Sequence, residues 1–474
     1  MSVDQAYPSS VRLTQSLLWN RTLRGATRPQ PVVVLLGPVG SGKTTALKSI
    51  SGACGANVIH ALVDFDHHEP GRPAPTTVET LAQVAFSLCR TWQRHPAAVR
   101  FTRFTLGLIA TQTLLEGQSR DQAKDTLRVS IEDVTHNRRA DRNVAKLVDM
   151  LVDSAKDAGV VPALPAEIIK NVLPALIRTV TRQPTRKAKQ WHAFFPEAEG
   201  ATPLDALVSL NSAGSTKQTN WLAGAFFADI RESHSRMARL DYLHQCSCPI
   251  PRKARHLHNW VLLLDNIDHE NGAKFVADLL AAREHHLTMN SSQHDALLII
   301  AASGRWDSSW EAEWRAPWRS SSDNTGPARA VPTCGRANYS HWAGRATEAP
   351  QAAYYPVLLE PLSIEETAHI LGVRQNEPEY YLAQRATGGL PGAVLLLKKL
   401  LRDQKALSRN HEFQHGPVTF STRSTRLTLV PIRGLSAWTT CALLSISRVS
   451  KSTSSSLRPR SPPRPGCCPT TRRA

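Results

Sequence analysis

The residues with the clearest chemistry lie between Gly37 and Thr45. Gly37 to Thr44 fit the pattern G-x-x-x-x-G-K-[ST] at every position. In such a loop the glycines let backbone N–H groups point inward to bind an anion, the lysine reaches the β- and γ-phosphates, and the hydroxyl ligates Mg²⁺. We therefore predict that ATP and Mg²⁺ bind here. The residues expected to hold them are Gly37, Pro38, Val39, Gly40, Ser41, Gly42, Lys43, Thr44 and Thr45.

A second chemical signal follows an apolar run, Val261 to Leu264, that ends in Asp265. A short buried strand that ends in an acidic residue is the Walker B pattern, and the carboxylate holds Mg²⁺ directly or through water. Such a run is common by itself, and a strand that simply ends at the surface is the alternative. Because the chain also has the phosphate-binding loop, we predict that Thr44 and Asp265 hold the metal together.

The elements around these motifs predict an α/β protein with a mostly parallel sheet. Apolar runs of strand length alternate with segments of helical periodicity. The expected strands are 32–36, 57–66, 260–265, 296–302 and a short one from 357. From about 98 to 250 the patterns are helical, which indicates a large helical insertion. A capping box, Ser363 with Glu366, opens the helices of a C-terminal lid.

The division of the chain that we expect has four parts. They are an N-terminal segment (1–30), a core (31–350) that contains the insertion, a helical lid (351–410) and a basic tail (411–474). Serine, threonine, arginine and proline dominate the tail, a composition typical of disorder. Two origins of this tail stay open: a natural basic extension, or a sequence read in a shifted frame.

Composition narrows the class of protein further. The formal net charge is +18, yet ten of the lysines and arginines follow Glu412, where no acidic residue occurs. The basicity therefore belongs mostly to the tail, where nucleic acid is a candidate partner. No apolar run approaches the ~18 residues that a membrane span needs. Eight irregularly spaced cysteines and no signal-peptide pattern predict a cytoplasmic protein without a disulfide framework.

Two smaller groups of residues have a weaker chemical interpretation. His244, Cys246, Cys248, His256 and His258 offer soft ligands, but their spacing matches none of the common structural zinc patterns. A basic cluster between 178 and 189 could bind phosphate, although a solvated helix end explains it better.

Taken in order, the motifs resemble those of the STAND/AAA+ group of P-loop ATPases, most closely the bacterial signal-transduction type. The resemblance rests on 37–44, 264–268, the strand that ends at Ser303-Gly304-Arg305, 359–363 and Gly389-Leu390-Pro391. It covers roughly 30–70 and 257–402 and does not explain the helical block between them. It implies a three-layer P-loop NTPase fold with a C-terminal helical lid. It also implies that Arg305 senses the γ-phosphate, and that Gly389, Leu390 and Pro391 help to close the adenine pocket.

The chain departs from this family where many members place a glutamate to polarise the attacking water. That position is Asn266, and the next carboxylate is Asp268, which we predict takes the role. We therefore expect slow ATP hydrolysis used as a conformational switch, with an unidentified protein partner and, as a further option, a nucleotide-dependent homo-oligomer. Two alternatives stay open: an AAA+-type DNA-associated ATPase, and a truncated scaffold that binds nucleotide without hydrolysing it. A small-molecule kinase is less favoured because no acceptor pocket is visible.

Overall fold

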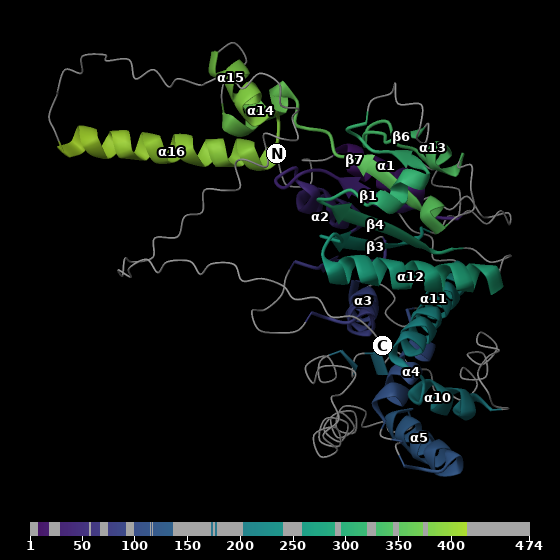
Figure 1. Ribbon diagram of the computed structural model, residues 1–474. Coiled ribbons are helices and arrows are strands. Elements are labelled where there is room, and N and C mark those ends of the chain that lie inside the picture. The colour runs from purple at the N-terminus through teal and green to yellow at the C-terminus, as the bar shows by residue number, and fades with distance from the viewer. Residues whose placement is uncertain are drawn as a thin grey trace, which may run out of the picture. The chain divides into compact units, whose positions relative to one another are not determined.

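A five-stranded parallel β-sheet lies at the centre of the described part of this computed structural model (Figure 1). Its strands pair in the order β2-β3-β4-β1-β7. Val32 at the start of β1 pairs with Ile299 on one side and Tyr354 on the other. The strands are β1 (Val32–Leu36), β2 (His60–Asp64), β3 (Trp260–Asp265), β4 (Leu297–Ser303) and β7 (Tyr354–Leu358). The predicted α/β class with a mostly parallel sheet is confirmed.

The structure describes residues 8–18, 29–55, 58–66, 74–91, 99–113, 115, 117–135, 172–173, 176–177, 202–239, 258–289, 295–319, 329–344, 350–372 and 378–414. Contacts divide the chain into 1–418 and 419–474. The predicted tail beyond Gln414, the basic cluster at 178–189 and all of the soft-ligand group except His258 lie outside the described residues. None of the described helices is both long and apolar enough to cross a bilayer.

Helices cover both faces of the sheet because the chain changes direction between strands. From β1 the chain moves across β4 and β3 to β2, and afterwards it returns strand by strand to β7. Since parallel crossovers are right-handed, opposite directions place their helices on opposite faces. Accordingly α2 (Lys43–Cys54) packs with α1 (Pro8–Leu18), whereas α3 (Thr77–Thr91), α11 (Ser215–Arg239) and α12 (Glu270–Met289) pack with one another. This produces a three-layer arrangement.

The middle strands are buried on both faces, which explains their continuous apolar sequences. Every residue of β1, β3 and β4 is buried, including Asp265 and Ser303 at two strand ends. A polar residue at such a position needs a partner or a function, because unpaired burial costs free energy. Several described residues at these ends are therefore candidates for chemistry rather than for packing.

The predicted helical insertion contains α4 (Thr102–Gln112), α5 (Arg120–Thr135), α10 (Pro203–Asn211) and α11. The buried side of α11 includes Phe226, Phe227, Ile230 and Met237. A buried ion pair joins α4 to α11, with Arg103 Nη1 2.9 Å from an Asp229 oxygen.

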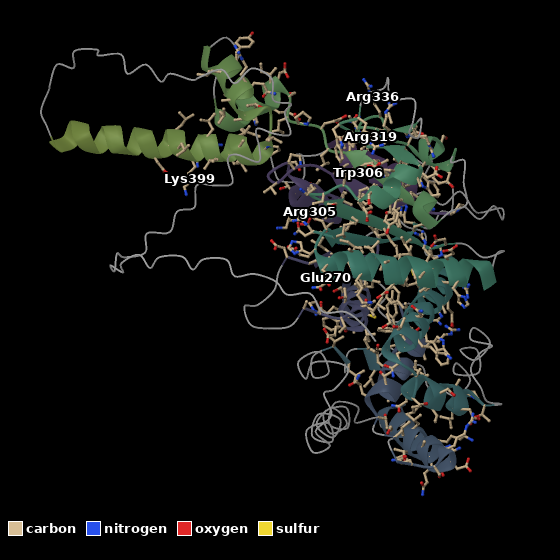
Figure 2. All side chains as sticks on the ribbon, in the orientation of Figure 1. Glu270, Arg305, Trp306, Arg319, Arg336 and Lys399 are labelled. Carbon is tan, nitrogen blue, oxygen red and sulfur yellow. The ribbon has the colours of Figure 1, made fainter. Side chains whose placement is uncertain are left out.

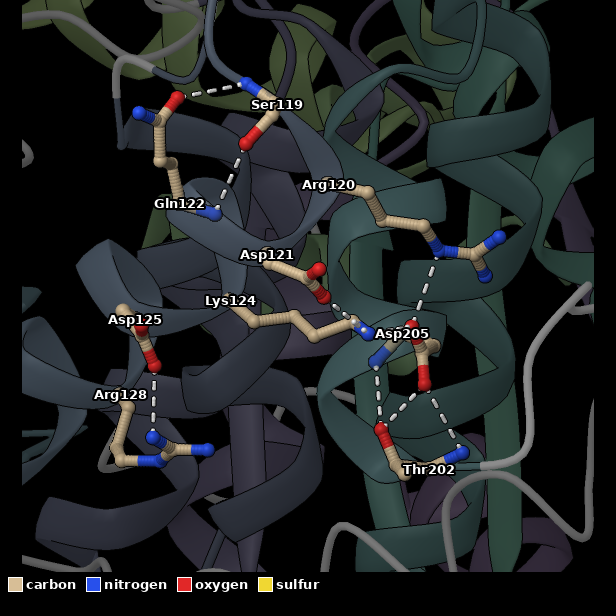
Figure 3. A network of polar contacts seen from close by, with 9 residues as sticks. All are labelled: Ser119, Arg120, Asp121, Gln122, Lys124, Asp125, Arg128, Thr202 and Asp205. Atoms are coloured by element: carbon tan, nitrogen blue, oxygen red, sulfur yellow. Dashed lines mark hydrogen bonds and ion pairs between the residues drawn. The ribbon is translucent and has the colours of Figure 1, made fainter.

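A polar network joins α5 to α10 (Figure 3). Asp205 lies in the first turn of α10, where the Thr202 hydroxyl caps the helix. Its carboxylate accepts a hydrogen bond from Arg120 and pairs with Lys124 at 2.8 Å. Although burial works against ionisation, Lys124, Thr202 and Arg120 hold the pKa of Asp205 at about 2. The insertion is thus fastened by charged side chains of its own helices.

The C-terminal helices begin with the predicted capping box. The Ser363 N–H donates to Glu366, and the Glu366 N–H donates to the Ser363 hydroxyl. The helices are α14 (Ile364–Leu371), α15 (Pro378–Thr387) and α16 (Pro391–Gln414). α16 extends to Gln414, four residues past the end of the predicted lid at 410.

Candidate functional site

The loop between β1 and α2 adopts the conformation that its glycines allow. Gly40 and Gly42 have φ angles of 82° and 87°, a region that residues with a Cβ rarely adopt. The Ser41 N–H donates to the Pro38 carbonyl at 3.1 Å, which closes the turn. Helix α2 begins at Lys43, immediately after the loop, so its unpaired N–H groups face the same space.

Lys43 lies within this loop rather than in solvent. Its ammonium donates to the carbonyls of Gly37 at 2.8 Å and Pro38 at 3.1 Å. Burial lowers the pKa of Lys43, and the carboxylates of Asp268 and Asp265 act in the opposite direction. The cation therefore lies between its own loop and two acidic residues, one at the end of β3 and one in the loop that follows it.

Asp265 ends β3 and is 1% exposed. The Asn266 N–H donates to its Oδ1 at 3.1 Å, and its Oδ2 has no hydrogen-bond partner among the described residues. Burial raises the pKa of Asp265, while the Thr44 hydroxyl, the Asn266 N–H and Lys43 lower it. The structure thus places the two residues predicted to hold a metal, Thr44 and Asp265, next to each other.

Asn266 is a residue whose role the sequence does not show. Its φ of 58° is the only positive value among the described non-glycine residues. Its side-chain amide donates to Asp64 Oδ1 at 2.8 Å, and Asp64 pairs in register with Asp265 in the sheet. This bond ties the ends of β2 and β3 together. The bond could not be inferred from the sequence, because it depends on the pairing of β2 with β3.

Asp268 and Arg305 lie in the loops after β3 and β4, but they differ in their contacts. Asp268 Oδ1 accepts a hydrogen bond from the Gly304 N–H at 3.2 Å. A Cβ built on Gly304 would be 3.2 Å from Asp268 Oδ2 and 3.8 Å from Lys43 Nζ, so the three residues meet. Arg305 is exposed, and Figure 2 shows it toward the same edge of the sheet as Glu270. Arg305, the predicted γ-phosphate sensor, therefore lies near this edge of the sheet, and it forms no ion pair with the residues that the structure describes.

The Gly389-Leu390-Pro391 turn leads directly into a contact with the phosphate-binding loop. Gly388 and Gly389 have positive φ angles, and the Gly389 carbonyl accepts a hydrogen bond from the Leu362 N–H at 2.8 Å. The next residue, Gly392 at the start of α16, donates its N–H to the Gly40 carbonyl at 2.8 Å. The turn and the loop are therefore neighbours in the structure.

These loops meet at the place where open α/β sheets bind ligands. The crossovers from β1 and β4, which are adjacent strands, leave toward opposite faces, so a crevice forms at the carboxyl ends of these strands. No group of three or more His, Cys, Asp and Glu residues in the described ranges is arranged to hold a metal by itself. Two protein ligands suffice for Mg²⁺ that also binds substrate phosphates and water.

Comparison with known proteins adds no family assignment. No protein-family model, no curated protein and no solved structure matches this chain. The resemblance to the STAND/AAA+ group therefore stays a prediction that rests on the motifs.

Proposed function

We propose that this chain is a P-loop NTPase that binds ATP with Mg²⁺, hydrolyses it slowly and uses the nucleotide as a conformational switch. The observation that carries the proposal is the convergence of Lys43, Thr44, Asp265 and Asp268 at one edge of the sheet. Two separate segments supply them, and Lys43 is within the electrostatic reach of both acids. Backbone N–H groups, one cation and a carboxylate beside a hydroxyl are the groups that a magnesium-bound triphosphate needs.

The residues at the proposed metal position fit Mg²⁺. Thr44 offers a hydroxyl oxygen, and Asp265 offers an oxygen, Oδ2, that has no partner among the described residues. Bound Mg²⁺ would neutralise charge on the phosphates. Lys43 would then leave the Gly37 and Pro38 carbonyls to meet the phosphate oxygens.

Asp268 is the carboxylate best placed to orient an attacking water. It is held by the Gly304 N–H and lies near Lys43. Asn266, which follows Asp265 directly, cannot accept a proton and is already engaged with Asp64. An asparagine directly after Asp265, with the next carboxylate two residues further on at Asp268, favours slow turnover over fast motor activity. It also supports the second candidate, a scaffold that binds nucleotide without hydrolysing it.

The contact between Gly40 and Gly392 supports the proposed switch. Because α16 begins on the phosphate-binding loop, a change in that loop can alter the position of the helix. The alternative of a DNA-associated ATPase depends on the tail and on 178–189, which lie outside the described residues.

The test is a titration of ATP and Mg²⁺ into the full chain, followed by a turnover assay with and without DNA. Lys43→Ala is expected to weaken ATP binding by about 2 kcal/mol or more, because it removes a charged hydrogen-bond partner. Lys48→Ala, an exposed lysine one turn further along α2, is the matched control. Equal affinities in the folded Lys43→Ala variant and the parent would refute nucleotide binding at this loop. Tight binding without turnover would select the scaffold.

A further inference from the structure

A cavity of about 1020 Å³ lies between α12 and the segment that follows β4. It reaches from Gln30, just before β1, to Asp268 and Arg305 at the opposite end of the sheet. The volume is that of a site for a small organic molecule. The residues of its wall that matter here are Gln30, Ala277, Trp306, Trp310, Trp342 and Tyr354.

The cavity exists because the connection from β4 to β7 contains no long helix in its described part. The described elements there are all short: the 3₁₀ turns Ser308–Ala312 and Pro350–Ala353, the two-residue strands β5 (Trp314–Arg315) and β6 (Arg329–Ala330), and the five-residue helix α13 (Tyr339–Ala343). The facing side of α12 carries alanines at every fourth position, Ala273, Ala277 and Ala281, and all three are exposed. Small side chains on one wall and an irregular segment on the other leave the space open.

The opposite wall is aromatic. The Trp306 and Trp310 rings are 5.3 Å apart and nearly perpendicular, and Tyr354 lies 5.7 Å from Trp310. Figure 2 labels Trp306 beside Arg305, from which it continues the chain. Aromatic walls around an unfilled space bind flat ring systems by stacking and edge contacts.

Three polar atoms in this wall are buried without a hydrogen-bond partner among the described residues: Gln30 Oε1, Trp306 Nε1 and Trp310 Nε1. Gln30 and Trp310 are 5% and 3% exposed. A buried polar group without a partner costs free energy, which a bound molecule can recover by supplying one. Protein atoms cover each of the three, so the side chains must turn slightly to meet a ligand.

The charged side chains that line the cavity carry both signs, and two of its cations are paired; the charged residues are Asp268, Lys274, Arg283, Glu284, Asp295, Arg305 and Asp307. Arg283 donates to Asp295 at 2.8 Å, and Lys274 pairs with Asp278 at 2.9 Å. The two indole N–H groups require acceptors, which an organic cation lacks, and the Gln30 oxygen requires a donor, which a carboxylate lacks.

We propose that this cavity binds a flat, uncharged, aromatic molecule that carries both a carbonyl acceptor and an N–H donor, such as a heteroaromatic lactam. The proposal is independent of nucleotide binding. Its consequence, that the ligand acts on ATP because Asp268 and Arg305 stand at one end of the cavity, rests on the proposed function.

The experiment measures binding of three two-ring probes to the full chain without nucleotide, by saturation-transfer NMR and titration. The probes are 2-quinolone (a neutral lactam), N-methylquinolinium (a cation) and 2-naphthoate (an anion). We expect saturable binding of 2-quinolone with a dissociation constant on the order of 1 mM, the affinity of a small fragment, and at least tenfold weaker binding of both ions.

Variants locate the bound probe. Ala277→Leu extends a larger side chain into the cavity and should weaken binding, whereas His285→Leu places the same side chain at an exposed position of α12 outside the cavity wall. Trp310→Phe keeps a ring but removes the N–H and should weaken 2-quinolone about threefold to tenfold. Melting curves of each variant confirm folding. The proposal is overturned if 2-quinolone does not bind, if an ion binds more tightly, or if folded Ala277→Leu binds it as well as His285→Leu does.

Discussion

Replacing Asp265 by asparagine tests whether the end of β3 is built for a metal at the expense of stability. Burial raises the pKa of this carboxyl above that of an unfolded aspartate. Between the two pKa values the native chain binds more protons than the unfolded chain. The free energy of unfolding therefore falls as the pH rises through this range and stays lower at pH 7.

The size of the effect follows from the unpartnered oxygen. Asp265 is 1% exposed and its Oδ2 has no described partner. Leaving a buried polar group unpaired costs about 1–3 kcal/mol, and more when the group is charged, so a neutral amide at this position costs less than the carboxylate. Asp265→Asn removes the buried charge while it keeps an oxygen that can accept from the Asn266 N–H. We expect the variant to melt about 2–5 °C higher than the parent at pH 7 without nucleotide. The difference should vanish as the pH falls below about 4, where the parent carboxyl is protonated in both states.

With Mg²⁺ and ATP bound, the parent should melt at a higher temperature than Asp265→Asn. A ligand at about 100 times its dissociation constant stabilises the native state by about 2.7 kcal/mol, and a variant without the metal ligand loses most of that gain. Differential scanning calorimetry with and without MgATP measures both effects, and Glu270→Gln, an exposed carboxyl nearby, is the control. If Asp265→Asn melts lower than the parent without nucleotide, the carboxylate is stabilising and the argument is wrong.

Two further perturbations separate chemistry from lid movement. Asp268→Asn should keep the ATP affinity within a few-fold and slow turnover by ~10²-fold, the scale of losing a general base; equal turnover in variant and parent excludes this role. Gly392→Ala places a Cβ 2.8 Å from the Gly40 Cα, so α16 must move from the loop, and proteolysis of 363–403 should become faster. Gly344→Ala, whose Cβ meets nothing closer than 3.5 Å, should leave that rate unchanged.

The sequence predicted those parts of the fold and site that depend on neighbours along the chain. Apolar runs identified β1, β3 and β4 because strands buried on both faces need them. The capping box and the loop from Gly37 to Thr44 are equally local, since their spacing sets which atoms meet. For the same reason the sequence predicts that Asp265 and Thr44 lie at the same edge of the sheet, and the structure has them in contact.

Features that depend on which strands are adjacent could not be predicted. The Asp64–Asn266 bond joins residues 202 positions apart and requires β2 to lie beside β3. The cavity requires knowledge of what packs between β4 and β7, and its polar wall atoms belong to residues without a motif. Composition and periodicity indicate which residues of a segment are buried. They do not indicate where the packing of two distant segments leaves a cavity.

The contact between α16 and the phosphate-binding loop sets a condition on any nucleotide switch in this chain. A ligand shifts an equilibrium only by its difference in affinity for two arrangements. The structure shows one of these arrangements. In it the Gly392 N–H donates a hydrogen bond to the Gly40 carbonyl, and the ammonium of Lys43 donates to two further carbonyls of the same loop. A triphosphate competes for Lys43 but not for the Gly40 carbonyl, because phosphate oxygens accept hydrogen bonds and cannot replace an N–H donor. Nucleotide binding thus leaves the α16 contact available. Movement of the lid must then come from a change in the loop backbone around Gly40, where the φ of 82° permits one.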